Sequence, residues 1–304
     1  PCDHIAGGAH STDLFVNASL RFLEEKDDSQ PWFMYTSLMA PHDPRTMPEK
    51  YLKMYDPEKI ELPANFAPEH DVDTGALRIR DELLAGFPRQ PDEIRRHIAE
   101  YYAMISHIDA AFGQLTDRLR EKGELENTII VFAGDNGLAV GRHGLMGKQN
   151  LYDHSVRVPL VFAGPGIPWG ETRDTGVYLL DIFPTLCELT GLDVPESVEG
   201  KSLVPSISDK SEPHRDMLYL AYADSIRGIS DGKFKLIEYA CGETQLFCTA
   251  EDPCETDNLA GDTACRETAD RLREELLRTS REWNDQDHPG GKEFWKRRPD
   301  IKGV

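Results

Sequence analysis

The residues best suited to chemistry lie between Gly134 and Asp153 of this 304-residue chain. Asp135 and Asn136 stand side by side after an apolar stretch, and a carboxylate next to an amide oxygen supplies two hard oxygen ligands for Ca²⁺ or Mg²⁺. Lys148 follows a glycine-rich stretch, where its ammonium suits the charge of a tetrahedral oxyanion. The pattern predicts a divalent-cation site beside an anion site.

The glycines of this stretch let the backbone turn tightly and approach an anion closely. The alternative interpretation is a surface loop in which Asp135, Asn136 and Gly137 form an ordinary turn. The apolar run that precedes them, and the His143 and Lys148 that follow, favour the binding site.

The surrounding pattern indicates an α/β protein. Apolar residues recur at helical spacing from Asp92 to Lys122, and residues 128–133 form an apolar run of strand length. A helix, a short turn, a buried strand and then a polar cluster are typical of a doubly wound sheet, in which ligands lie outside the carboxyl ends of the strands. Further helices are expected at 11–25, 179–189 and 265–283, and strands at 32–38, 158–163, 225–230, 233–239 and 244–248.

These elements suggest two domains. We expect a main α/β body at 1–205 and a smaller antiparallel subdomain at 206–304, packed by a terminal helix. Residues 45–92 are predicted to form a long irregular loop, and loops of that length are usually functional.

Composition excludes some functions. With 34 Lys and Arg against 54 Asp and Glu, the net charge of −20 argues against a nucleic-acid binder, which needs a basic face. The apolar runs are too short to span a membrane. The six cysteines do not have paired zinc-site spacing, and both disulfides and free thiols remain open.

The chain resembles the type I sulfatases of the alkaline phosphatase superfamily. The matching motifs follow the family's order along nearly the whole chain, at 33–44, 135–148, 152–160, 181–186, 200–203, 245–247, 252–253 and 258–259. The resemblance implies the sulfatase fold, hydrolysis of a sulfate ester, and a bound Ca²⁺, with Mg²⁺ as the alternative.

The resemblance also implies roles for individual residues. Asp135 and Asn136 match calcium ligands of the family, and Lys148 matches the lysine that contacts the sulfate ester. His42, in Pro-His-Asp-Pro, matches a loop histidine that reaches the sulfate and the leaving group. His143 lies between these motifs and is expected to contact the substrate.

One part of the family pattern is missing. Its nucleophile is a formylglycine made from Cys or Ser in a C-x-P-S-R or S-x-A-x-R type motif, and further metal ligands accompany it upstream of the matched region. Cys2 lacks the required proline and arginine, and Ser211 to Arg215 spells S-x-P-x-R in the wrong place, in a polar connector. We therefore expect the C-terminal two-thirds of a sulfatase, inactive by itself.

Two other functions stay open. A phosphonate monoester or phosphodiester hydrolase of the same superfamily would share nearly every motif, and a non-catalytic remnant would bind anions without turnover. The expected partner is a small sulfated substrate such as a sulfated sugar, with no nucleic acid and no membrane span. The resemblance favours a periplasmic, extracellular or lysosome-like compartment, and the oligomeric state stays open.

Overall fold

The computed structural model describes residues 9–301, which form two compact units. The first unit contains the described residues up to Leu62 together with Arg89–Ile129, and the second contains Pro63–Pro88 and the described residues from Ile130 onward. The boundary predicted at residue 205 falls inside the second unit and stays a prediction. Each unit is described by itself.

The first unit is a pair of packed helices with short helical turns. Helix α1 (Ser11–Glu25) contacts the long helix α3 (Pro91–Glu121), as both ranges were predicted from helical periodicity. His107 Nε2 lies 2.7 Å from Asp13 Oδ1 and joins the two helices. The remaining elements are α2 (Glu49–Leu52), η1 (Pro57–Lys59) and η3 (Leu125–Asn127).

The strand predicted at 32–38 is wrong. Residues 31–39 are extended and alternate between exposed and half-buried, with Phe33 75% and Tyr35 81% exposed, but they form no ladder. A strand needs a hydrogen-bonded neighbour as well as an alternating pattern. Among the residues described, this segment has no neighbouring strand.

The second unit contains a pair of strands, and the first of them is followed by the loop that carries Asp135, Asn136 and Lys148. Strands β1 (Ile130–Ala133) and β2 (Leu160–Ala163) pair antiparallel, with Ile130 opposite Ala163. The α/β class predicted from the sequence is confirmed, and the two strands described in this part of the chain run antiparallel. The same unit also contains η2 (Glu82–Leu84), α4 (Asp153–Val156), η4 (Leu179–Asp181), α5 (Ile182–Thr190) and α6 (Val204–Ser208).

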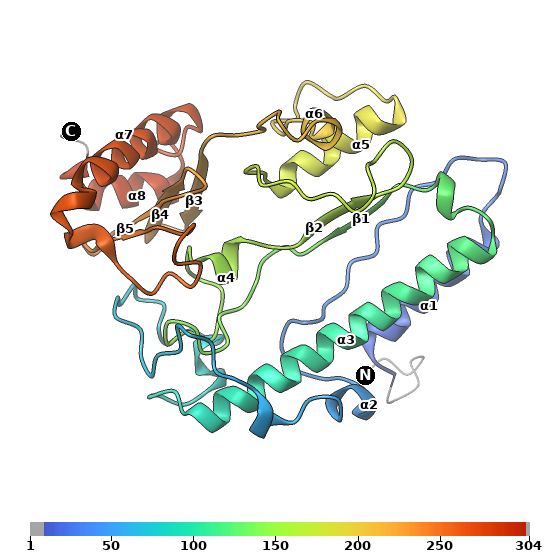
Figure 1. Cartoon of the computed structure of the whole chain (residues 1–304), viewed down its shortest axis with the longest axis horizontal. Coiled ribbons are helices and arrows are strands. Elements are labelled where there is room, and N and C mark those ends of the chain that lie inside the picture. The colour runs from blue at the N-terminus through green and yellow to red at the C-terminus, as the bar shows by residue number, and fades with distance from the viewer. Residues whose placement is uncertain (1–8, 302–304) are drawn as a thin grey trace. The chain divides into compact units, whose positions relative to one another are not determined.

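The predicted antiparallel subdomain with its terminal helix is confirmed. A four-stranded meander contains β3 (Leu218–Tyr222), β4 (Ile226–Ser230), β5 (Lys235–Tyr239) and β6 (Thr244–Phe247). Helices α7 (Arg266–Glu282) and α8 (Pro289–Arg297) lie against this sheet (Figure 1). Their apolar faces bury Leu272, Leu276, Phe294 and Trp295 over the sheet. Short 3₁₀ turns η5 (Leu259–Gly261) and η6 (Thr263–Cys265) connect β6 to α7.

Strand β3 and helix α8 were not predicted. Of the two states left open for the cysteines, the structure shows free thiols at the five that it describes, Cys187, Cys241, Cys248, Cys254 and Cys265. Cys2 lies outside the described residues. No helix in the described range 9–301 combines the length and apolar character needed to cross a membrane.

Candidate functional site

The two predicted metal ligands follow directly after β1. Asp135 is exposed, and its Oδ1 accepts a hydrogen bond from the backbone N–H of Asn136 at 2.8 Å. Asn136 Nδ2 donates to the carbonyl of Gly137 at 2.9 Å. Asp135 Oδ2 and Asn136 Oδ1 have no bonded donor among the described residues, so both oxygens can bind a cation.

Gly137 ties this pair to helix α4. Its N–H donates to the carbonyl of Ser155 at 2.9 Å. A Cβ atom at Gly137 would lie 1.9 Å from the carbonyl oxygen of His154, so only glycine fits this close approach of two backbones. The position of Asn136 therefore depends on the position of α4.

The chain then folds back, so that the segment leading to Lys148 lies beside the segment that follows Asn136. Ala139 N–H donates to the carbonyl of Gly147 at 2.9 Å, and Gly141 N–H donates to the carbonyl of Leu145 at 2.7 Å. Leu145 is buried in the apolar core of this unit. The return places the backbone of Lys148 beside the segment that follows Asn136, which brings the predicted anion and cation ligands into one loop.

A buried carboxylate fixes the returning segment. Glu82, 3% exposed, accepts the backbone N–H of Met146 on Oε2 and the backbone N–H of Gly147 on Oε1, both at 2.8 Å. Sequence reasoning missed this residue, because nothing near Glu82 in the sequence points to a loop more than sixty positions away. Its place within the long loop 45–92, expected to be functional, was the only hint.

Lys148 is half-buried and forms no ion pair with a carboxylate of the described residues. The nearby Asp81 accepts Gln149 Nε2 at 2.8 Å and also binds Arg80. Burial alone would raise the pKa of Asp81, but the hydrogen bonds from Gln149 and Arg80 hold it below its ordinary value, and the charge of Lys148 adds to this effect. The ammonium of Lys148 is thus close to a carboxylate without being paired with one.

His143 is held in a ring stack. Its ring lies 4.0 Å from that of Tyr152 at an interplanar angle of 9°, and its Nε2 lies 3.1 Å from Asn65 Nδ2. Because Asn65 donates to Nε2, the neutral ring carries its proton on Nδ1. Burial lowers the pKa of His143 to about 4, so the ring is uncharged at neutral pH. This packing supports the loop, and contact with a substrate stays a prediction.

The same histidine lines a polar cavity of about 260 Å³. His70 and Tyr152 line it as well, together with the carboxylates Glu69 and Asp71. The acidic lining does not suit a sulfate.

His42 belongs to the first unit. Its N–H donates to the carbonyl of Met39 at 3.0 Å, and its Nδ1 lies 3.1 Å from the carbonyl of Asp43. Asp135, Asn136, His143 and Lys148 all belong to the second unit. That His42 and Lys148 reach one sulfate therefore stays a prediction.

The S-x-P-x-R segment has a structural explanation. Ser211 is exposed and its hydroxyl donates to Asp209 Oδ1 at 2.7 Å within a turn. Arg215 and His214 both contact the fully buried carboxylate of Asp181, with Arg215 Nη2 at 2.7 Å from Oδ1. The segment therefore anchors a connector to the start of α5.

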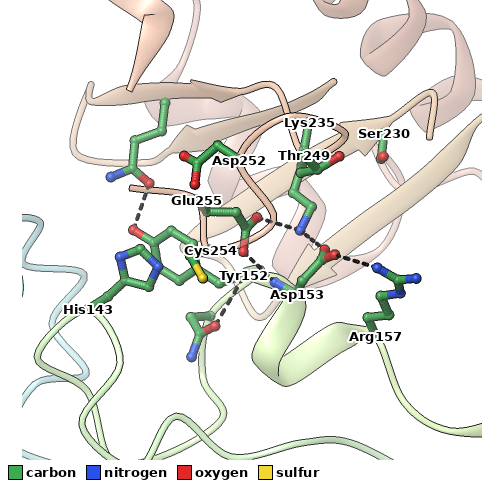
Figure 2. Close-up of polar contacts among 12 residues, drawn as sticks. His143, Tyr152, Asp153, Arg157, Ser230, Lys235, Thr249, Asp252, Cys254 and Glu255 are labelled. Carbon is green, nitrogen blue, oxygen red and sulfur yellow. Dashed lines mark hydrogen bonds and ion pairs between the residues drawn. The ribbon is translucent and has the colours of Figure 1, made fainter. Parts of the chain in front are cut away.

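A second group was missed by sequence reasoning. The buried Lys235 and Glu255 form an ion-paired cluster with the partly exposed Asp153, which also pairs with Arg157, and Figure 2 shows the cluster beside Tyr152. Lys235 lies on β5, where the alternating pattern did not single it out. Its partners are the first residue of α4 and a loop residue about a hundred positions later, and only the folded chain reveals them.

The residues present fit part of a calcium site. Ca²⁺ takes six to eight oxygen ligands, and Asp135 and Asn136 provide two with the right chemistry. Within residues 9–301, no group of three or more His, Cys, Asp and Glu side chains is arranged to hold a metal ion. Asp135 and Asn136 would therefore hold the ion only together with other ligands.

Comparisons with known proteins agree with the motifs. A family model described as Sulfatase matches residues 2–192, and a model of the N-sulphoglucosamine sulphohydrolase C-terminal region matches residues 141–282. An arylsulfatase of Clostridium perfringens is 33% identical over 279 residues, covering 88% of this chain and 57% of the relative. The chain thus spans little more than half of that relative's length.

Solved structures show the same fold. A structure described as a complex with the substrate D-glucosamine-2-N,6-O-disulfate aligns with a TM-score of 0.79 at 22% identity, covering 93% of this chain and 72% of the other. The phosphonate monoester hydrolase of Agrobacterium radiobacter aligns with a TM-score of 0.74 at 28% identity, covering 88% of this chain and 59% of the other.

Proposed function

Because the chain belongs to the sulfatase family, we propose that it is the C-terminal part of a sulfuric ester hydrolase whose nucleophile lies outside residues 1–304. The observation that carries this proposal is the loop after β1. It carries Asp135 and Asn136, whose free side-chain oxygens suit a cation, and backbone hydrogen bonds return the segment that ends at the unpaired Lys148 to the residues that follow Asn136.

Each residue has a distinct task in the proposal. Asp135 and Asn136 would hold Ca²⁺, or Mg²⁺, which supplies positive charge to the sulfate oxygens when bound. Lys148 neutralises charge on a further oxygen, and a preorganised cation in a partly buried site is worth more than one in water. His42 would approach the leaving-group oxygen. Sulfate transfer, like phosphoryl transfer, depends mostly on positioning and electrostatics of this kind.

None of these residues is a credible nucleophile, and covalent catalysis needs a group that attacks. We place a formylglycine, with the remaining metal ligands, in the upstream part of the protein. Coverage of only 57% of the arylsulfatase relative agrees with this. Residues 1–304 alone are then expected to be inactive.

The substrate is proposed to be a small sulfated sugar or alcohol, and the compartment an exported or lysosome-like one. The glucosamine disulfate in one structural relative supports the sugar. A phosphonate monoester or phosphodiester hydrolase is the second candidate, because a phosphonate monoester hydrolase aligns at 28% identity.

A substrate panel separates these functions. The protein with its upstream region restored is assayed on 4-nitrophenyl sulfate and on matched phosphonate and phosphodiester esters. We expect the sulfate ester to have the highest kcat/KM, and Lys148→Ala to lower it at least 100-fold, in the range of a lost charge-stabilising group. Lys210→Ala, which removes an exposed lysine, is the control. A higher kcat/KM on the phosphonate would favour the second candidate, and binding of anions without any turnover would favour the non-catalytic remnant.

A further inference from the structure

Lys235 is a buried lysine that the proposed chemistry does not use. It is 2% exposed, and its Nζ contacts both Asp153 and Glu255, with Glu255 Oε1 at 2.7 Å (Figure 2). Glu255 is also 2% exposed. Removing one partner from such a cluster leaves a charge buried and uncompensated, which is strongly unfavourable.

Glu255 also binds backbone. Its Oε2 accepts the N–H of Asp153 at 2.7 Å, across 102 positions of sequence. Asp153 is the first residue of α4, and the first N–H groups of a helix have no partner inside the helix. The C-terminal subdomain therefore holds α4 by its first residue, through both the side chain and the backbone of Asp153.

A second contact from the same subdomain acts on the preceding residue. Tyr152 donates its hydroxyl to Gln245 Oε1 on β6 at 2.8 Å. Tyr152 is 1% exposed and its N–H also donates to Asn150 Oδ1 at 3.1 Å. Residues 152 and 153 are thus fixed to the four-stranded sheet.

Helix α4 in turn contacts the first arm of the loop, and the second arm runs directly into it along the chain. The carbonyl of Ser155 accepts the N–H of Gly137, next to Asn136, at 2.9 Å. Asn150, just before α4, donates its N–H to the carbonyl of Lys148 at 2.9 Å. A shift of α4 would therefore displace the Asn136 arm through the Gly137 contact and act on Lys148 through residues 149–152, which join Lys148 to the helix.

We infer that Lys235 and Glu255 are positioning residues, through which the C-terminal subdomain sets the placement of the Asn136 and Lys148 arms. Its consequence for catalysis rests on the proposed function, whereas the placement of the two arms is a property of this chain alone. It assigns the subdomain a role in the site although its residues need not touch the substrate.

A matched variant separates this role from general stabilisation. Lys235→Met removes the buried charge while keeping much of the side-chain volume. Arg273→Met is the control, because Arg273 Nε lies 2.9 Å from Glu238 Oε1, another fully buried carboxylate on β5 that does not contact α4. Each variant breaks two ion pairs, those with Asp153 and Glu255 in the first and those with Glu238 and Asp270 in the second, and only the first releases the loop.

The direct test is hydrogen–deuterium exchange of the 304-residue chain, with no need for activity. We expect peptides covering residues 136–156 to exchange at least tenfold faster in Lys235→Met, and to be unchanged in Arg273→Met. Lys235→Arg should recover part of the protection. If Lys235→Met does not fold, Glu255→Gln replaces it, with a smaller acceleration because its amide oxygen still accepts one N–H. Unchanged exchange at 136–156 in the folded variants would overturn the inference.

The catalytic consequence is read separately, in the protein with its upstream region. There we expect Lys235→Met to lower kcat for 4-nitrophenyl sulfate at least tenfold and Arg273→Met less than twofold. Absence of sulfate hydrolysis in the unmodified protein would reject the proposed function, while the exchange result would still decide the positioning role. Equal kcat values for unmodified protein and Lys235→Met would reject the positioning role even if sulfate is hydrolysed.

Discussion

The backbone of Gly137 lies against that of His154, so close that a Cβ atom on Gly137 would stand 1.9 Å from the His154 carbonyl oxygen. The carbonyl of Ser155, the residue after His154, accepts the N–H of Gly137 at 2.9 Å. This contact joins the residue after the predicted metal ligands to the short helix α4.

Gly137→Ala is therefore expected to destabilise the chain by about 3 kcal/mol, the upper end of the usual cost of overpacking, because backbone atoms must move. Urea unfolding followed by circular dichroism measures this. The control is Gly113→Ala in helix α3, where a Cβ meets nothing within 4 Å. It should stabilise by about 0.5–1 kcal/mol, since alanine favours a helix. Equal stability of Gly137→Ala and the unmodified chain would contradict the described contact.

Glu82→Ala should destabilise the chain by about 2 kcal/mol or more, because the buried N–H groups of Met146 and Gly147 lose their acceptor. Glu82→Gln should cost less, since one carbonyl oxygen remains. Glu61→Ala removes an exposed carboxylate and should change the free energy of unfolding by less than about 0.5 kcal/mol. Urea midpoints of the three variants test this, and a Glu82→Ala midpoint like that of Glu61→Ala would count against the buried contact.

The pH dependence of stability follows from His143. Burial lowers its pKa in the folded chain to about 4, whereas the unfolded side chain titrates near 6.5. Between these values the unfolded chain binds a proton that the folded chain does not, so stability falls as the pH is lowered from 6.5 toward 4. Burial also lowers the pKa of His70 and His154, which adds to the same slope.

His143→Gln should therefore flatten, but not abolish, the loss of melting temperature between pH 6.5 and 4.5. His288→Gln, at an exposed position, should keep the full slope. Melting curves across this range measure both. An unchanged slope in His143→Gln would show that the ring is not buried in its neutral form.

Asp135→Ala should weaken the response to Ca²⁺ in the protein with its upstream region restored. After metal removal with EDTA, we expect the Ca²⁺ concentration for half-maximal sulfatase activity to rise at least tenfold, because a charged oxygen ligand is lost. Asp174→Ala, at an exposed position, is the control. An equal Ca²⁺ requirement in both variants would remove Asp135 from the metal site.

Much of the fold could be predicted from local sequence patterns. Helices α1 and α3 were predictable because apolar residues recur at helical spacing, and strands β4 to β6 because short strand-like runs are separated by turn residues such as Asp231 and Gly232. The segment 32–38 has the right pattern but no pairing partner within the described chain, and pairing is a tertiary property. Strand β3 and helix α8 were missed because the first follows a polar connector and the second has a glycine pair near its start.

The residues of the candidate site also divide into those that the sequence indicates and those that only the folded chain reveals. Asp135, Asn136 and Lys148 stand out in the sequence because chemically distinctive residues are close together there, and their roles stay a prediction. Glu82, Lys235 and Glu255 could not, because each acts on a backbone or side chain far away along the chain. Their contribution depends on their burial in the folded chain, which the sequence around a charged residue does not reveal.

The central claim is that residues 1–304 supply charge and positioning while the nucleophile lies upstream. The most direct measurement is hydrolysis of 4-nitrophenyl sulfate by residues 1–304 and by the protein with its upstream region, each co-expressed with a formylglycine-generating enzyme and examined for the aldehyde by mass spectrometry. We expect no turnover and no aldehyde in residues 1–304, and both once the upstream region is present. Turnover by residues 1–304 alone, lost in Ser211→Ala, would contradict it and place the nucleophile in the S-x-P-x-R segment.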